Sequence, residues 1–284
     1  MDETQSPPVT MLQELTSTSK PTPQTDSQFL TALAPEIRIM IYEYVFGCGD
    51  LHIFIYEQKL VSMLCRNPTA TGLDGHESCI SMPMSRSAGM NWNPDTIRER
   101  LSSPNMRHVS ALLAVCRTIY LESVDILYRR HVLHFSTLFS ISVFPRAIIP
   151  HHLDMLRHVR LSLALFNRRT MMHVYFDNSF SRSWPGWDEK SLLGDTPWHC
   201  AWNAIGELKS LHTLLVTLEV LREDHQREEP HWYRPMPLDF ETSLFQPMKQ
   251  VSCSDFLLRV NWPSTGIPLG EYPFRIERFT NTST

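Results

Sequence analysis

Apolar side chains recur at helical spacing near the start of the chain. Ile37, Met40, Ile41, Tyr44 and Val45 lie at i, i+3, i+4, i+7 and i+8, the period that places residues on one face of an α-helix. The proline and glutamate at positions 35 and 36 suit a helix's first turn, and the glycine at position 47 suits its end. The pattern predicts an amphipathic helix over residues 35–47.

A second helical pattern and three short β-type runs follow. Residues 51–56 and 60–65 are β-type runs separated by three polar residues, which predicts a β-hairpin. Helical spacing returns over residues 112–128, and residues 131–135 have the character of a short strand. Each helix carries an apolar stripe that needs cover, so we expect the two helices to pack together. The predicted contact places Ile37, Ile41 and Tyr44 against Leu112, Cys116 and Ile119.

Two stretches of the second half repeat one another at a distance of 55 residues. Each passes from three-residue spacing of apolar side chains, typical of a helix end, into the two-residue alternation of a strand. The first stretch has Leu153, Leu156, Val159, Leu161, Leu163 and Leu165, and the second has Leu208, Leu211, Leu214, Val216, Leu218 and Val220. A helix from about Pro197, with Trp198, Trp202 and Ile205 on one face, would connect them. We therefore expect two neighbouring parallel strands, 159–165 and 214–220, joined by a right-handed crossover.

These patterns predict an α+β or α/β chain in which an N-terminal helical module precedes a mixed sheet with crossover helices. The leucine spacing of the repeated stretches is also similar to a degenerate leucine-rich repeat. We expect a disordered tail over residues 1–28, a helical module with its hairpin over 29–136, and an α/β region over 137–279. A loop insertion is expected at about 67–93, a surface loop at 223–237, a last strand at 255–260 and a frayed end at 280–284.

Two separated blocks resemble a family of fungal F-box-like proteins that contain a domain of unknown function. The first block is Leu33-Ala34-Pro35-Glu36-Ile37-Arg38 followed by Ile41-Tyr42, which is similar to that family's Leu-Pro-x-Glu-Ile-Arg-x-x-Ile-Tyr opening. The second block is Cys116-Arg117-Thr118-Ile119-Tyr120-Leu121-Glu122, which is similar to its Cys-Arg-x-Ile-Tyr-x-Glu segment. The resemblance covers residues 29–47 and 110–136 directly.

The resemblance implies a protein–protein interaction module, and further implies a substrate adaptor of a ubiquitin ligase. By analogy with F-boxes, the partner would be the linker subunit of the ligase, received by an exposed apolar ridge formed by Leu33, Pro35 and Met40. Two alternatives stay open. The chain can be a hydrolase or transferase on a diverged α/β fold, with its site at strand ends near residues 165–169 and 221–224, or a structural scaffold.

Charge, composition and missing motifs argue against several other classes of function. The net charge of −4 and the pI of about 6.3 give no basic excess for nucleic acid or an anionic membrane. The sequence contains no signal-peptide core, no membrane-spanning run, no glycine-rich phosphate loop and no nucleophile elbow. Six cysteines without paired short spacing favour reduced thiols, so we expect a soluble cytoplasmic or nuclear protein.

Metal and catalytic candidates are weak at the level of sequence. Cys65, His76 and Cys79 match no zinc template, and they leave a fourth ligand unaccounted for. His151, His152 and His158 have no carboxylate or cysteine at ligand spacing. We therefore predict a protein that is not an enzyme and that binds no cofactor or metal.

Overall fold

The structure is a computed structural model of the chain, and it describes residues 24–47, 49–56, 59–65, 67, 109, 111–165, 196–220, 238–264 and 271–279. The described strands are β1 (Asp50–Tyr56), β2 (Lys59–Leu64), β3 (Val132–Phe135), β4 (His158–Leu165), β5 (Thr213–Val220), β6 (Asp255–Val260) and β7 (Arg275–Arg278). The described helices are α2 (Gln28–Ala32), α3 (Pro35–Phe46), α7 (Arg117–Arg130), α8 (Leu138–Ala147), α9 (Pro150–Leu153), α11 (Pro197–Gly206), α12 (Leu238–Phe245) and the 3-10 helix η4 (Gln246–Gln250).

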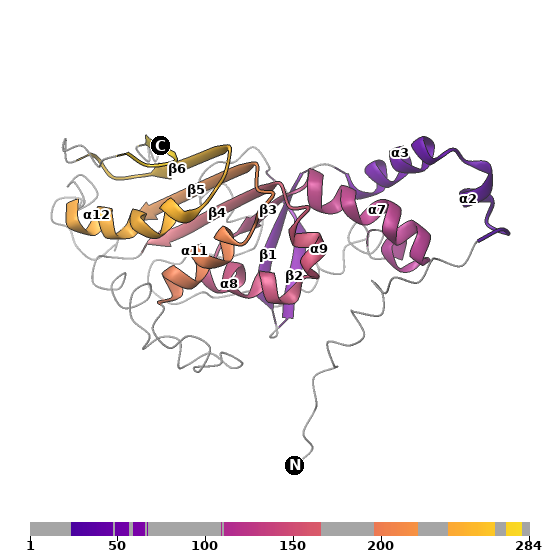
Figure 1. Ribbon diagram of the computed structural model, residues 1–284, viewed down its shortest axis with the longest axis horizontal. Coiled ribbons are helices and arrows are strands. Elements are labelled where there is room, and N and C mark those ends of the chain that lie inside the picture. Colours follow the sequence, from indigo (N-terminus) through magenta and orange to yellow (C-terminus); the bar gives the residue numbers. More distant parts are fainter. Residues whose placement is uncertain are drawn as a thin grey trace, which may run out of the picture.

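In the described ranges the strands form one seven-stranded sheet in the order β2-β1-β3-β4-β5-β6-β7 (Figure 1). The β1–β2 hairpin is antiparallel, and every other neighbouring pair is parallel. The fold is therefore α/β, with a mixed, mostly parallel sheet and helices between the strands. The strands predicted from sequence at 51–56, 60–65, 131–135 and 255–260 are confirmed to within one residue at each end.

The 55-residue offset between the two repeated stretches equals the pairing register of two neighbouring strands. β4 pairs with β5 in parallel, and His158 lies opposite Thr213, 55 positions along the chain. The alternating apolar residues of both strands then share one face of the sheet, because paired residues in a parallel ladder point the same way. The prediction of adjacent parallel strands with a common apolar face is confirmed.

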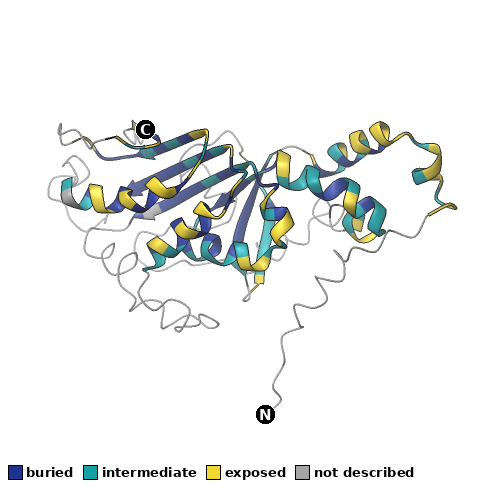
Figure 2. Cartoon of the chain, viewed as in Figure 1, coloured by how far each residue is buried: buried dark blue, intermediate teal, exposed yellow. Residues whose placement is uncertain are grey.

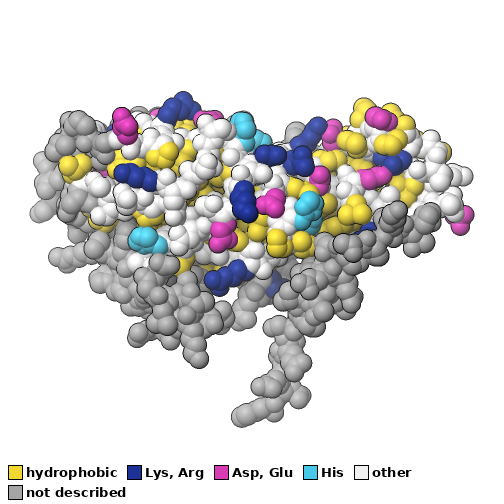
Figure 3. All heavy atoms as spheres, in the orientation of Figure 1, with side chains coloured by type: hydrophobic (Ala, Val, Ile, Leu, Met, Phe, Trp, Pro, Cys, Tyr) yellow, Lys and Arg dark blue, Asp and Glu magenta, His cyan; other side chains and the backbone are white. Residues whose placement is uncertain are grey.

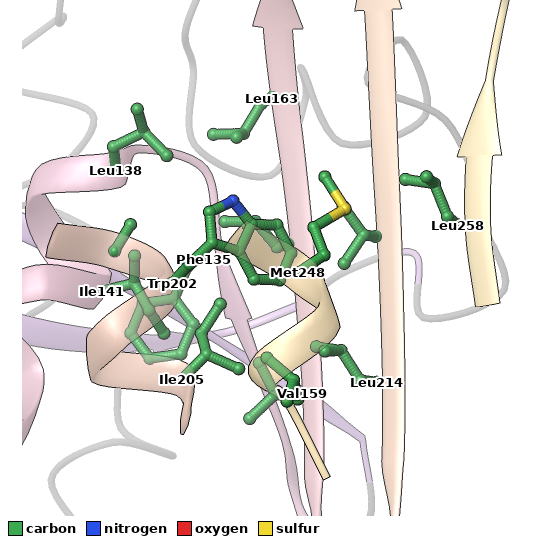
Figure 4. Close-up of a cluster of buried hydrophobic side chains, with 14 of the residues drawn as sticks. Phe135, Leu138, Ile141, Val159, Leu163, Trp202, Ile205, Leu214, Met248 and Leu258 are labelled. Carbon is green, nitrogen blue, oxygen red and sulfur yellow. The ribbon is translucent and has the colours of Figure 1, made fainter. Parts of the chain in front are cut away.

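Helices α8, α11 and α12 lie along that apolar face (Figure 1). This arrangement follows from the strand order, because right-handed crossovers that always step in one direction bring their helices to one side of the sheet. Trp202 of α11 lies in the core among Phe135, Ile205 and Met248, which come from β3, α11 and η4 (Figure 4). The predicted helix from Pro197 is confirmed, and its residues Trp198, Trp202 and Ile205 are fully buried.

Helices α8, α12 and η4 and strand β7 of the second half were not predicted from sequence. Helix α8 contains Pro145, a residue that normally ends a helix. Its N-cap is Thr137, whose hydroxyl accepts a hydrogen bond from the Ser140 amide. Strand β7 contains a single apolar residue, Ile276, and therefore shows no alternation. The predicted insertion after residue 67, the loop at 223–237, the end at 280–284 and most of the predicted tail lie outside the described residues.

Candidate partner-binding surface

Helices α3 and α7 form a pair beyond the ends at which β1 and β3 begin (Figure 1). Each helix leads directly into its strand, and the two strands are parallel. Tyr42 and Phe46 of α3 pack with Ile119 of α7 in a small core that also includes Val109. The prediction that the two sequence blocks pack together is therefore confirmed.

A partly buried ion pair joins the two helices at the centre of this contact. The Arg38 guanidinium donates from Nε and Nη2 to the two carboxylate oxygens of Glu122, at 3.0 and 2.6 Å. The Tyr42 hydroxyl donates to the same carboxylate at 2.8 Å. The remaining Nη1 group of Arg38 donates to the carbonyl oxygens of Leu30 and Leu33, at 3.2 and 2.7 Å. This bidentate geometry, with two parallel hydrogen bonds, is the strongest form of arginine–carboxylate contact.

The groups of this cluster shift one another's pKa values. The Arg38 hydrogen bonds hold the pKa of Glu122 below its ordinary value, despite the opposing effect of burial. Burial, followed by the hydrogen bond to Glu122, raises the pKa of Tyr42. Glu122 is therefore ionised at neutral pH and Tyr42 keeps its proton, so the two side chains act as acceptor and donor.

The orientation of α3 differs from the sequence prediction. The buried residues of the helix are Arg38, Tyr42 and Phe46, at i, i+4 and i+8. Ile37 and Tyr44, predicted to face the core, are 45% and 89% exposed. The prediction that these two residues are buried was wrong, because Glu122 and two carbonyl oxygens satisfy the Arg38 guanidinium and make it an interior residue.

The apolar stripe of α3 consequently faces outward. Ile37, Met40 and Tyr44 follow i, i+3 and i+7 on one side of the helix, and Met40 is 62% exposed. Figure 2 shows the outer side of α3 exposed and the side toward α7 buried. Hydrophobic side chains are visible on the molecular surface over this helix (Figure 3). We call Ile37, Met40 and Tyr44 the outer stripe.

The residues predicted from sequence to bind a partner are only partly brought together. Met40 belongs to the outer stripe, whereas Leu33 is half-buried at the end of α2. Pro35 is exposed in the first turn of α3, but it is five positions from Met40 and so points about 140° away around the helix axis. Ile37 and Tyr44 were missed as surface residues, although their spacing with Met40 is visible in the sequence.

The face of the sheet opposite α8, α11 and α12 carries polar side chains. Asp50 Oδ2 lies 2.5 Å from Arg160 Nη1, and His134 shares a 2.9 Å hydrogen bond with Ser162. A serine–histidine pair is a motif of nucleophilic catalysis, but both side chains are fully buried here. The pair is a buried hydrogen bond between β3 and β4. The strand ends considered for an enzyme site lie outside the described residues, apart from Leu165.

The histidine and cysteine candidates are dispersed. His151 is exposed on α9, His152 is buried against α7, and His158 contacts Thr213 on β5. Cys65 is half-buried, whereas positions 76 and 79 lie outside the described ranges. Within those ranges, no three histidine, cysteine, aspartate or glutamate side chains are placed to hold a metal ion. No described helix is long and apolar enough to cross a membrane.

Comparison with known protein families matches residues 22–278 to DUF7730, a domain of unknown function. The matched segment includes both sequence blocks and all the described strands. No curated protein and no solved structure gives a significant match.

Proposed function

The chain belongs to the DUF7730 family over residues 22–278, and we propose that it is a non-enzymatic, protein-binding adaptor of the F-box-like type. The observation that carries this proposal is the outer stripe of α3. Large apolar residues in regular helical spacing on a surface are typical of a helix that receives a partner.

The form of the stripe favours a helical partner. Helix α3 has 12 residues, so it offers about three turns, roughly 18 Å, of continuous contact. Ile37, Met40 and Tyr44 combine a branched, a flexible and an aromatic side chain on that surface. Tyrosine is enriched among the residues that dominate binding energy, and methionine adapts to irregular partner surfaces.

The rest of the module is suited to holding this surface in place. The Arg38–Glu122 pair fixes the rotation of α3 about its axis, and Arg130 of α7 makes a second ion pair with Glu43 of α3 at 2.6 Å. A rigid binding surface loses less conformational entropy when a partner docks. The Arg38–Glu122 contact joins one residue from each sequence block, which supports the F-box-like interpretation of those blocks.

The linker subunit that F-boxes bind is accordingly the partner to test. Purified chain is titrated with purified linker subunit by calorimetry, as wild type and as the Ile37→Arg and Ile39→Arg variants. Ile39 is the matched control, because it is 41% exposed on the same helix but lies about 160° around the axis from Ile37 and about 140° from Tyr44. We expect Ile37→Arg to weaken binding by about 2 kcal/mol or more, roughly 30-fold, and Ile39→Arg to leave affinity nearly unchanged.

Two outcomes would contradict the proposal. Failure of the folded wild-type chain to bind the linker subunit would remove the ligase assignment. If the chain instead formed a dimer that Ile37→Arg dissociated, as measured by analytical ultracentrifugation, the outer stripe would be a self-association surface.

A further inference from the structure

Two adjacent histidines on the short helix α9 lie in opposite environments. His151 is exposed, whereas His152 is only 4% exposed. Helix α9 belongs to the connection from α8 to β4, and it contacts α7 of the helical pair. His152 therefore lies in the joint between the helical pair and the sheet.

Two tyrosines of α7 enclose the His152 ring. The Tyr128 ring stacks on it, with centroids 4.9 Å apart and planes inclined by 20°. The Tyr120 hydroxyl lies 3.3 Å from His152 Nε2. In the neutral ring with its proton on Nδ1, Nε2 accepts the Tyr120 hydroxyl hydrogen, and the apolar faces of the two rings are in contact.

A proton on His152 changes this contact. The cation carries a proton at Nε2, so this nitrogen can only donate, and the Tyr120 hydroxyl must change from donor to acceptor while the ring stays only 4% exposed. The charged and titratable groups that act on the ring from the described neighbours are Asp125 on α7, which favours the cation, and His151 on α9, which opposes it. Burial opposes the cation most strongly and, with His151, keeps the pKa of His152 below its ordinary value.

We propose that the contact between α7 and α9 is an acid-sensitive joint, in which protonation of His152 loosens the helical pair from the sheet. The imidazole is neutral and docked at neutral pH. As the pH falls below about 6.5, release of α9 lets His152 reach water and bind its proton at the ordinary affinity, so protonation and release are coupled. This inference does not depend on the proposed adaptor function.

The second buried histidine at this joint has a different arrangement. His131 Nδ1 lies 3.1 Å from the carbonyl oxygen of Leu127, and its Nε2 lies 3.3 Å from that of Phe46. Burial lowers the pKa of His131 too, but a protonated His131 would donate to both carbonyls, and Asp50 of β1 also favours the cation. Each ring nitrogen of His131 has a carbonyl acceptor that offsets part of the cost of burying the cation, whereas His152 has a single hydroxyl, which is why the joint's acid response is assigned to His152.

Hydrogen exchange measured by mass spectrometry at about pH 7.5 and about pH 5.5, corrected for intrinsic rates, tests this inference. In the wild type we expect peptides from α7 and α9 to lose protection by about tenfold at the lower pH, while the β4 and β5 peptides keep theirs. His152→Phe retains stacking on Tyr128 but cannot titrate, and should abolish this loss. His151→Phe is the matched control and should behave as the wild type.

The inference is overturned if His152→Phe shows the same pH-dependent loss as the wild type, or if the wild type shows none. Should His152→Phe fail to fold, an NMR titration of the wild-type His152 ring decides the question. A midpoint below that of an unstructured histidine, coincident with the loss of protection in α9, supports the joint. A midpoint at the ordinary value, or one without loss of protection, contradicts it.

Discussion

Arg38 shows how a single charged residue sets the orientation of a helix. Its guanidinium occupies the inward side of α3, where it has partners on α7, on α2 and in the turn between α2 and α3. Glu122 is 84 residues away in the sequence. Removing one member of such a pair leaves the other partly buried without its counter-charge, which costs more than the net contribution of the pair.

Glu122→Gln should lower the free energy of unfolding by about 1–3 kcal/mol at neutral pH, because the variant keeps an acceptor for Tyr42 but loses the charge that pairs with Arg38. The control is Asp125→Asn on the same helix, which removes a pair with Arg129 in which both side chains are largely exposed. It should change stability by less than about 1 kcal/mol. Equal effects of the two variants in urea unfolding would contradict a special role for Glu122.

The same variant has a predicted pH dependence. Because the folded-state pKa of Glu122 lies below its ordinary value of 4.5, its stabilising contribution is complete above that value and is lost as pH falls through the folded-state pKa. The stability difference between wild type and Glu122→Gln should therefore shrink below about pH 4.5. A difference that stayed constant down to about pH 3 would show that the charge is not the cause.

At the scale of elements, the connection from α3 to β1 depends on backbone conformation. Gly47 ends α3 with φ 70° and ψ −167°, a region open essentially to glycine alone, and its amide donates to the Glu43 carbonyl. This turn directs the chain from the helix into the first strand of the sheet. The glycine was predicted as the helix end from sequence, because no other residue type fits such a position so readily.

Gly47→Ala should destabilise the protein by about 1–3 kcal/mol, although a Cβ atom there would meet no neighbour within 4 Å. The cause is backbone strain and not a clash. Gly206→Ala is the control, since this residue ends α11 without a positive φ and its Cβ would make ordinary contact with Gln250. It should be neutral or stabilising by up to about 1 kcal/mol. Thermal unfolding of both variants checks the difference, and a harmless Gly47→Ala would refute the strain.

The sequence predicted the positions of helices and strands along the chain better than it predicted which face of each helix is buried. The sequence predicted β4, β5 and α11 because the apolar residues of each element recur with a clear period, and only one side of each element faces the hydrophobic core. The face of α3 could not be found in the same way. Periodicity identifies an apolar stripe but does not say whether the chain itself covers it, and the residues that bury α3 include an arginine whose partner is distant in the sequence.

At the scale of the molecule, the order of the strands separates the core from the proposed binding surface. From β3 to β7, each successive strand lies next to the one before it, and the connecting helices α8, α11 and α12 lie on one face of the sheet. The hydrophobic core lies between these helices and the sheet. The α3–α7 pair lies beyond the strand starts, with a small core of its own. The outer stripe of α3 is not part of either described core, and its three side chains are exposed.

Oxidative footprinting of the methionines, with the chain alone and in complex with the linker subunit, tests the outer stripe most directly. Met40 is exposed on α3, whereas Met63, Met155 and Met248 are buried and serve as internal references. We predict that Met40 is oxidised fastest of these four in the free chain and is protected in the complex, while the other three do not change. Oxidation of Met40 as slow as that of Met248 would show that the stripe faces inward, and an unprotected Met40 in a saturated complex would show that the partner binds elsewhere.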